Sequence, residues 1–527
     1  MNSYLGQKGY TINKSELTIE NQVKIRNDLT IKPFSPWEGS PLNDTKTFPA
    51  YRESPNKFYV PHYYGVENFG KPKEYKISEG VDIDLDFNGK LRDYQEPVVN
   101  KFVKHCLDVK YGGGLLELYC AWGKTSASLY IITQLKKKTI VIVHKEFLMN
   151  QWIERIQQFL PKARIGKIQG PIIDIDNKDI VIAMLQSLSM KDYPPSVFES
   201  FGFTIIDEVH HISSEVFSNS LFKLVTKNML GLSATMNRKD GTTPVFKMFL
   251  GDVIFKSKRD NDRAVTVRAI EYYVDDDDFN EVKFDFRGKP QYSTMISKLC
   301  EYNRRSEFIL KILSDMLEEN SDQQIMILAH NKNLLKYLHD AVLHRNIATV
   351  GYYIGGMKET ALKETESKKV VIATYAMAAE ALDVKTLTTL IMATPKTDIE
   401  QSVGRILREK HSSPIVVDIV DNHDIFKNQW RKRKTFYKKE NYKIIYTTNV
   451  NYTTDISKWT TVFDPNPNGP KECKSKNKKT ISIKSNSSSE KSITNDSDDD
   501  YEKEQKEPVI NKPGKIIDDI CYLKIKN

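Results

Sequence analysis

A chain of 527 residues is too long for one ordinary domain, so two or three domains are expected. Its formal charge of +9 favours a polyanionic partner such as nucleic acid, although a lysine-rich solvated surface would give the same balance. Five scattered cysteines without a Cys-x-x-Cys pair argue against a zinc ribbon and a disulfide framework, and no secretory signal or membrane-length apolar run is found. We therefore expect a soluble intracellular protein without a membrane partner.

Residues 1–85 form a polar lead-in with prolines at short intervals, and we expect a small accessory region there that is irregular or β-containing. Its aromatic stretch at residues 58–65 has two interpretations. It can stack on nucleic-acid bases, or it can pack under the domain that follows, and packing is the favoured interpretation.

Residues 86–258 show short apolar runs that alternate with helical patterns. The expected strands lie at 115–118, 139–143, 180–183, 203–206 and 229–232, and the expected helices at 126–135 and 146–159. Because the strands are apolar throughout and separated by helices, they predict a parallel sheet covered on both faces.

The stretch at residues 118–125 ends in Gly123, Lys124 and Thr125, and such a tripeptide at a strand-to-helix turn is typical of a phosphate-binding loop. Lys124 would reach the outer phosphates, and the Thr125 hydroxyl would bind Mg²⁺. The usual opening glycine is replaced by Leu118, so a chance tripeptide is the alternative. The predicted cofactor-binding loop comprises Cys120, Ala121, Trp122, Gly123, Lys124, Thr125 and Ser126.

Two carboxylates, Asp207 and Glu208, follow the strand predicted at 203–206. Ligands collect at the carboxyl ends of parallel strands, which places this pair near the phosphate loop. We expect Asp207 to hold Mg²⁺ and Glu208 to orient and deprotonate the attacking water.

A second α/β domain is expected at residues 301–440, after a charged linker at 259–300. Its expected strands lie at 325–328, 370–373, 389–392 and 415–419, and its helices at 306–317 and 333–343. The linker contains four consecutive aspartates at 275–278, which indicate a solvated acidic loop rather than a metal site. Residues 441–464 are assigned to a C-terminal extension, and the low-complexity residues 465–527 to a disordered tail.

Arg405 and Arg408 in the second domain are three residues apart and are expected to share one helix face. Two guanidinium groups on one face suit a phosphate, and one of them could reach across a cleft between the domains. An ion pair between Arg405 and Glu409 is the alternative.

Five motifs in order resemble helicase superfamily 2: residues 91–95, 121–125, 207–210, 233–235 and 401–408. The family has two RecA-like domains in tandem, with ATP between them and nucleic acid across both. Residues 231–241 are similar to the branch of the xeroderma pigmentosum group B helicase, and residues 59–65 look like the transcription helicases of large DNA viruses.

The resemblance implies roles for individual residues. Arg92 and Gln95 match the adenine-recognising segment, and Glu380 and Asp383 match a motif that couples the second domain to the nucleotide. His210, Ser233 and Thr235 match residues that link hydrolysis to domain closure. The residues expected to act in catalysis are Lys124, Glu208, Gln401, Arg405 and Arg408. Segments 143–145 with Trp152, 184–187, 329–331 and 374–376 match strand-contacting positions.

Ala121 and Ala381 depart from the family pattern, which often has glycine at these places. Each adds a Cβ where the backbone comes close to a ligand or a neighbour, which can lower turnover. ATP binding is still expected, because the charged positions of the site are present.

The expected function is an ATP-dependent helicase or translocase that uses Mg²⁺ and moves on nucleic acid, with DNA favoured and RNA possible. Such a motor would act as a monomer in viral transcription or in DNA repair or replication, in the host cytoplasm or the virion if it is viral. Two alternatives stay open: a duplex DNA translocase that remodels complexes without unwinding, and a nucleic-acid-binding module that does not hydrolyse ATP.

Overall fold

The computed structural model describes residues 2–33, 47–108, 112–119, 121–211, 214–236, 238, 240–257, 264–286, 288–380, 382, 384–408, 411 and 413–466. Contacts divide the chain into two units, Met1–Thr480 and Ile481–Asn527, and every described residue belongs to the first. The tail predicted at 465–527 lies outside the described residues except for its first two positions, as do Cys120, Ala381 and Asp383.

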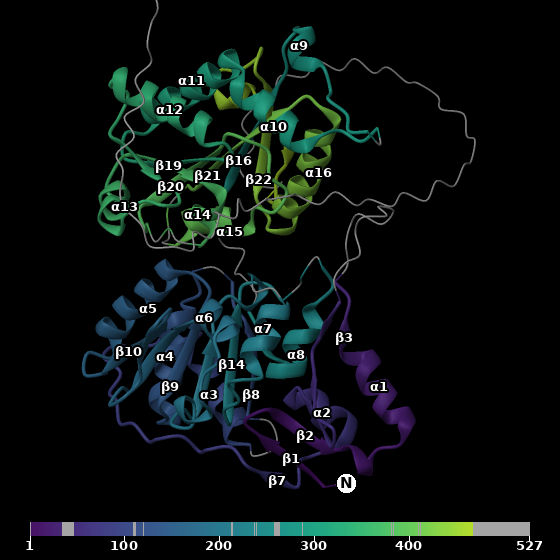
Figure 1. Cartoon of the computed structure of the whole chain (residues 1–527). Coiled ribbons are helices and arrows are strands. Elements are labelled where there is room, and N and C mark those ends of the chain that lie inside the picture. Colours follow the sequence, from purple (N-terminus) through teal and green to yellow (C-terminus); the bar gives the residue numbers. More distant parts are fainter. Residues whose placement is uncertain are drawn as a thin grey trace, which may run out of the picture. The chain divides into compact units, whose positions relative to one another are not determined.

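The N-terminal region forms a five-stranded sheet in the order β5-β6-β2-β1-β7, which corresponds to the β-containing form expected from the sequence (Figure 1). Its elements are β1 Ser3–Gly6, β2 Gly9–Asn13, α1 Ile19–Leu29, β5 Arg52–Glu53, β6 Lys57–Val60, α2 His62–Phe69 and β7 Glu74–Tyr75. A two-stranded sheet of β3 (Thr30–Ile31) and β4 (Phe48–Pro49) adjoins α1. Tyr10, Ile12 and Phe58 are fully buried in a core of this region's own.

The aromatic stretch at residues 58–65 is a packing segment. Phe58, His62 and Tyr64 are buried, and the Tyr63 hydroxyl donates a hydrogen bond to the Gly113 carbonyl at 3.3 Å. Gly113 begins the first strand of the next domain, so this segment attaches the N-terminal region to it.

The first large sheet has the order β11-β10-β12-β9-β13-β14-β8-β15 and is parallel except for β11. Its strands are β8 Gly113–Glu117, β9 Thr139–Val143, β10 Ile165–Gln169, β11 Ile172–Asp174, β12 Ile180–Met184, β13 Phe203–Ile206, β14 Asn228–Ser233 and β15 Val253–Lys256. The helices are α3 Glu96–Leu107, α4 Lys124–Leu135, α5 Glu146–Phe159, α6 Leu185–Met190, α7 Ser214–Leu221 and α8 Thr243–Leu250.

Two separate cores cover the faces of this sheet. Along β9, Val141 packs with residues of α3, α4 and α5, whereas Ile140 packs with residues of α6, α7 and α8. Successive side chains of a strand point to opposite faces, so a strand buried on both faces must be apolar throughout. The predicted doubly covered parallel sheet is therefore confirmed, and we call this part lobe 1.

The second large sheet, with its helices, forms lobe 2 and has the order β18-β19-β17-β20-β21-β16-β22-β23, parallel except for β23. Its strands are β16 Thr266–Tyr272, β17 Gln324–Ala329, β18 Val350–Tyr353, β19 Val370–Thr374, β20 Leu387–Met392, β21 Ile415–Asp421, β22 Lys443–Thr448 and β23 Thr460–Phe463. The helices are α9 Asp277–Asn280, α10 Tyr292–Glu301, α11 Asn303–Glu319, α12 Lys332–His344, α13 Glu359–Glu366, α14 Tyr375–Glu380, α15 Glu400–Gly404 and α16 Asp424–Lys439. The chain is thus α/β with two RecA-like sheets in tandem.

The boundaries predicted for lobe 2 differ from the structure. The expected linker contains β16, which pairs with β21 and β22 inside the sheet, and the expected extension supplies β22 and β23. The strand β16 was not predicted, because it contains charged residues. Arg268 forms an ion pair with Glu319 at 2.6 Å, so its charge is paired within a buried strand.

The acidic run at 275–278 caps a helix. One Asp276 oxygen accepts the Phe279 backbone N–H at 3.0 Å and the other accepts the Tyr302 hydroxyl at 2.9 Å. Within the described part of the chain, no group of three or more His, Cys, Asp or Glu residues is arranged to hold a metal ion.

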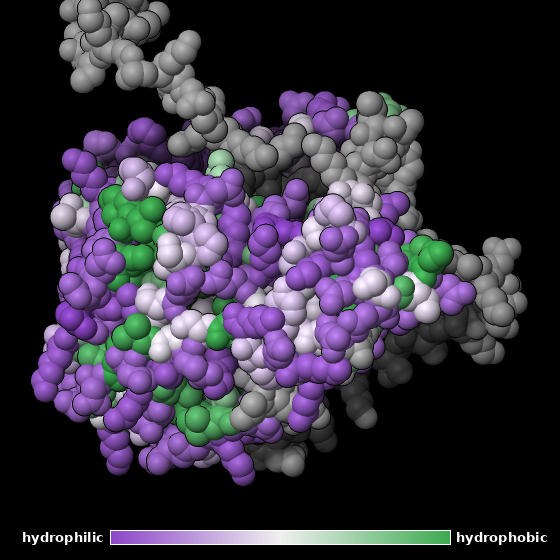
Figure 2. Space-filling model, turned by 60° about the horizontal axis from the view of Figure 1, so that its bottom comes forward, coloured by the Kyte–Doolittle hydropathy of each residue, from purple (hydrophilic) through white to green (hydrophobic). Residues whose placement is uncertain are grey.

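Figure 2 shows a molecular face on which hydrophobic residues are scattered in small groups among hydrophilic ones. Among the helices that the structure describes, none combines the length and the apolar character needed to cross a bilayer.

Candidate active site

The predicted phosphate loop joins β8 to α4. Leu118 continues from the strand and is buried, and its N–H donates to the Ser233 carbonyl at 2.8 Å. Gly123 precedes α4 with φ +92°, and a Cβ at this position would overlap the side-chain amide of Gln95. Glycine is therefore required at the turn where the backbone enters α4.

The Gln95 side chain binds the backbone of this loop, and its expected role in adenine recognition stays a prediction. Its amide nitrogen donates to the carbonyls of Trp122 at 3.0 Å and Gly123 at 3.3 Å, while its oxygen accepts the Arg92 N–H at 2.9 Å. The Trp122 side chain is buried in the core of lobe 1, so only its backbone belongs to the loop. Both amide groups of Gln95 are engaged because the side chain is only 2% exposed.

Ala121 adopts the left-handed region with φ 70°. This conformation is easy for glycine and strained for a residue with a Cβ, so the departure from the family pattern has a structural cost here. Thr125 and Ser126 line the pocket described below.

Asp207 and Glu208 follow β13 at its carboxyl end, as predicted. One Asp207 oxygen accepts the Trp152 indole N–H at 2.9 Å, and Glu208 forms an ion pair with Lys124. Burial raises the pKa of Asp207, and repulsion by Glu208 raises it further, while Lys124 opposes the shift. Two adjacent carboxylates in a buried place match the electrostatics that a divalent cation would stabilise.

His210 connects this carboxylate pair to lobe 2. Its Nδ1 lies 2.6 Å from the Ser233 hydroxyl and 3.4 Å from a Glu208 oxygen, and its Nε2 lies 3.0 Å from the side-chain nitrogen of Gln401. Since the amide nitrogen of Gln401 can only donate, His210 accepts at Nε2 and carries its proton at Nδ1; this tautomer is assigned from the network.

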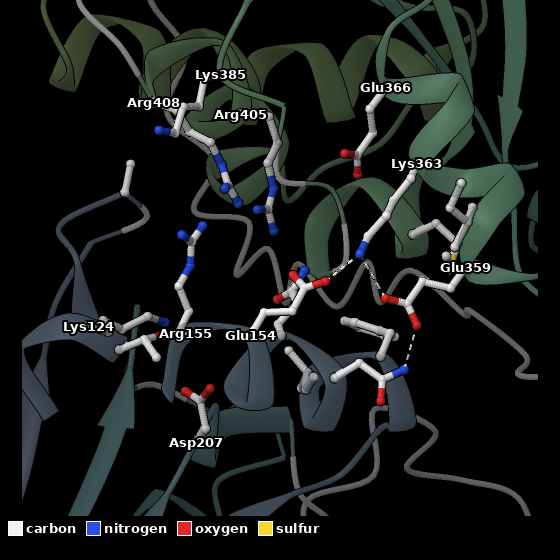
Figure 3. Close-up of a pocket in the computed structure, with 18 of the residues that line it drawn as sticks. Lys124, Glu154, Arg155, Asp207, Glu359, Lys363, Glu366, Lys385, Arg405 and Arg408 are labelled. Carbon is white, nitrogen blue, oxygen red and sulfur yellow. Dashed lines mark hydrogen bonds and ion pairs between the residues drawn. The ribbon is translucent and has the colours of Figure 1, made fainter. Parts of the chain in front are cut away.

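A pocket of about 970 Å³ lies between the two lobes (Figure 3). The predicted site residues that line this pocket are Arg92, Ala121, Gly123, Lys124, Thr125, Ser126, Asp207, Glu208, Arg405 and Arg408. Gln401 is not among its lining residues. The Gln401 side chain contacts His210 beside the pocket, and its expected role in catalysis stays a prediction.

Arg405 and Arg408 reach the pocket without the single α-helical face that the sequence predicted. Helix α15 ends at Gly404, and Arg405–Leu407 forms a 3₁₀ turn. Arg405 is 7% exposed, and its guanidinium donates to the Leu382 carbonyl at 2.8 Å. Glu409, the alternative ion-pair partner, lies outside the described residues.

Helix α5 supplies a pocket residue that the sequence analysis did not single out, Arg155. In Figure 3 the guanidinium groups of Arg155, Arg405 and Arg408 point into the same space, with Lys124 at one side and Asp207 below. Asn150, Glu154 and Gln158 recur every fourth residue on the same helix, so a polar stripe on α5 was the available signal.

Direct contacts join the lobes next to this cluster. Lys363 on α13 pairs with Glu154 on α5 and lies 3.3 Å from Glu359, which accepts the Asn150 amide at 2.9 Å. These side chains are about half exposed, so they position the lobes weakly.

The segments predicted to contact a nucleic-acid strand gather at the carboxyl ends of both sheets. In lobe 1 the Gln186 amide donates to the His144 carbonyl at 2.7 Å, and in lobe 2 the His330 ring lies 2.9 Å from the Thr394 hydroxyl and 4.7 Å from the Tyr375 ring. Trp152 does not join them, because its buried indole binds Asp207.

Comparisons with known proteins show which family the chain belongs to. Residues 88–238 match the family model described as type III restriction enzyme, res subunit. A predicted ATP-dependent RNA helicase of Acanthamoeba polyphaga mimivirus is 35% identical over 449 residues, covering 83% of this chain and 85% of that one. A predicted ATP-dependent RNA helicase of African swine fever virus is 28% identical, covering 67% and 74%.

A predicted helicase of Invertebrate iridescent virus 6 is 26% identical, covering 69% of this chain and 85% of that one. The crystal structure of T4 UvsW aligns with 85% of this chain and 99% of its own at 16% identity and a TM-score of 0.33. The identity and mutual coverage of the mimivirus relative, together with the two RecA-like sheets, decide the family. The chain belongs to the ATP-dependent helicases of superfamily 2 found in large DNA viruses.

Proposed function

We propose that the chain hydrolyses ATP in the pocket between its lobes and uses the cycle to move along or unwind nucleic acid, with DNA as the favoured substrate. The observation that carries this proposal is the cluster of Lys124, Arg155, Arg405 and Arg408 opposite Asp207 and Glu208 in one pocket. Four cations from two lobes provide the charge that a polyphosphate requires, and two carboxylates provide the metal ligand and the base.

Lys124 would hold the outer phosphates, and Arg405 and Arg408 would stabilise charge on the transferred phosphoryl group. Asp207 and the Thr125 hydroxyl would hold Mg²⁺, whose charge neutralises the phosphates. The fit rests on the buried Asp207–Glu208 pair, since a cation relieves the repulsion that raises the Asp207 pKa. Glu208 pairs with Lys124 in the structure, and phosphate binding to Lys124 would free this carboxylate to act as the base.

Coupling between the lobes would run through His210. The ring lies between Glu208 in lobe 1 and Gln401 in lobe 2, so a change at the catalytic carboxylate alters a contact that spans the lobes. Lobe opening and closing would then step the protein along a phosphate backbone. Gln95 would contribute to nucleotide binding through its contacts with the phosphate loop. Asp383 would contribute to nucleotide binding from lobe 2.

DNA is favoured because residues 231–241 are similar to the xeroderma pigmentosum group B branch, a likeness that stays a prediction. RNA is the second candidate, because the mimivirus and African swine fever virus relatives are named as RNA helicases. Viral transcription or DNA repair, in the host cytoplasm or the virion, is the context that this family membership favours.

The test measures ATP hydrolysis by the full-length protein without nucleic acid and with single-stranded DNA, duplex DNA or RNA. Stimulation by DNA and not by RNA supports the favoured substrate, whereas stimulation by RNA alone assigns the motor to RNA. Lys124→Ala and Glu208→Gln should abolish turnover in a protein that still folds, and full turnover in either variant would overturn the site.

Strand separation is measured next, on a duplex with one labelled strand. Hydrolysis stimulated by duplex without strand displacement would favour the translocase that remodels complexes. No hydrolysis under any condition would favour the binding module, and ATP binding would then be measured in the wild-type protein.

A further inference from the structure

Helix α16 concentrates positive charge to a degree found in no other described helix of the chain. Its 16 residues carry seven Lys or Arg and one Asp, a formal charge of +6, against +9 for all 527 residues. Asp424 lies in the first turn, and every other charged residue of the helix is basic.

The inner face of α16 is fixed to the second sheet. Phe426, Arg433 and Tyr437 are buried, and the Arg433 guanidinium forms two hydrogen bonds with Asp418 at 2.8 Å. Tyr437 donates to the same carboxylate at 2.9 Å. Of the seven cations, Arg433 is thus neutralised inside the protein, and the helix is held rigidly.

The other six cations lie off this buried face. Lys427, Arg431, Lys434 and Lys438 are spaced by four, three and four residues, which places them on one helical stripe. Lys432 and Lys439 lie about a third of a turn further around the helix. We call the four residues Lys427, Arg431, Lys434 and Lys438 the α16 stripe.

Few acidic groups neutralise the α16 stripe. Lys427 lies 3.6 Å from Glu271, whereas within the part of the chain that the structure describes no carboxylate lies within 4.0 Å of Arg431, Lys434 or Lys438. Like charges on neighbouring turns repel one another, and an external anion would relieve that repulsion.

The stripe is separate from the nucleotide pocket. Helix α16 packs on β21 and β22, whereas the pocket residues of α13 pack beside β18 at the opposite end of the strand order (Figure 1). No residue of α16 is among the described lining residues of the pocket. An anion on the stripe is therefore a second ligand and not the ATP.

We propose that the α16 stripe binds the phosphate backbone of duplex nucleic acid, outside the track formed by the helicase motifs. From Lys427 to Lys438 the stripe extends about 16 Å along a straight axis. One strand of a duplex carries about five phosphates over that length. A rigid row of cations matches a rigid row of phosphates, whereas a flexible acidic peptide would lose conformational entropy on binding.

The proposal rests on the proposed function only in taking nucleic acid as the partner. The experiment compares full-length wild type with the triple variant Arg431→Gln, Lys434→Gln and Lys438→Gln. A second triple variant, Lys32→Gln, Lys71→Gln and Lys90→Gln, removes the same charge from exposed lysines far along the chain and is the matched control.

Binding of a fluorescently labelled 30-base-pair DNA duplex is measured across a range of salt concentrations. The slope of log affinity against log salt should fall by roughly two to three for the α16 variant, because each phosphate contact contributes about 0.9. The affinity of the α16 variant at 100 mM salt should fall at least tenfold. The control variant should keep the salt slope and the affinity of the wild type. Equal slopes and affinities in the two triple variants would overturn the proposal.

The acidic residues near the C-terminus are the competing occupant. A full-length variant with Asp498→Asn, Asp499→Asn and Asp500→Asn tests them. Tighter duplex binding in this variant, with none lost in the α16 variant, would assign the stripe to the tail and overturn the proposal. ATP turnover without nucleic acid should be normal in the α16 variant. The effect of Lys124→Ala on ATP turnover therefore tests the proposed function, whereas duplex binding by the α16 variant tests this inference.

Discussion

The side-chain nitrogen of Gln401 lies 3.0 Å from Nε2 of His210, although 191 residues separate them in the chain. The contact joins lobe 2 to the residue that also touches Glu208 and Ser233. It is therefore a direct structural link between Glu208, the proposed catalytic base, and the opposite lobe.

We expect Gln401→Ala to lower kcat for nucleic-acid-stimulated hydrolysis about tenfold or more, with little change in the KM for ATP, because Gln401 lies beside the pocket and does not line it. Steady-state kinetics with and without duplex DNA measure this. The control is a double-mutant cycle with His210→Ala. If the two effects multiply in the double variant, the residues act independently and the link is refuted.

Ala121→Gly should stabilise the protein, since Ala121 occupies the left-handed region at φ 70°. Relief of that strain is worth about 1 kcal/mol, partly offset by the greater freedom of glycine in the unfolded chain. Thermal unfolding with turnover measured in parallel gives the result. Ala127→Gly, inside α4, should lower the melting temperature instead, and a fall in both variants would contradict the strain argument.

Arg155→Gln should raise the KM for ATP roughly tenfold, the worth of one lost charge-assisted hydrogen bond. The expectation follows from Figure 3, where this guanidinium points toward those of Arg405 and Arg408. Arg164→Gln is the matched control, because Arg164 belongs to the same lobe but pairs with Asp179 away from the pocket. An equal KM in the two variants would remove Arg155 from the nucleotide site.

We expect low pH to destabilise the packing of the N-terminal region, because His62 is buried there. Burial lowers the pKa of His62 to about 4, and its Nε2 has no hydrogen-bond partner among the described residues. Between pH 6.5 and 4 the unfolded chain binds this proton and the folded chain does not. The free energy of unfolding is therefore not reduced by His62 above pH 6.5. It decreases as the pH falls from 6.5 to 4, by about 3 kcal/mol at most.

Melting temperatures measured from pH 7.5 to 4.5 test this expectation. His62→Leu should show a weaker pH dependence than wild type, whereas His344→Leu removes an exposed histidine and should not. A pH dependence that is the same in all three proteins would show that His62 is not responsible.

The alternation of apolar strands and helices was readable in the sequence, because a strand buried on both faces has no polar positions. Thr139–Val143, Glu146–Phe159 and Phe203–Ile206 were predicted with the bounds that the structure has. The strand β16 was missed, because Arg268 makes it look like a charged linker until its partner Glu319 arrives from α11.

The placement of Lys124 at a strand-to-helix loop and of Glu208 after a buried strand could also be predicted, since both depend only on the local sequence. Only the tertiary structure decided which residues meet across the lobes. Gln401 contacts His210 and Arg155 faces the pocket because α5, α13 and α15 converge there. Such contacts depend on the packing of elements far apart in the chain, and neither composition nor spacing encodes that packing locally.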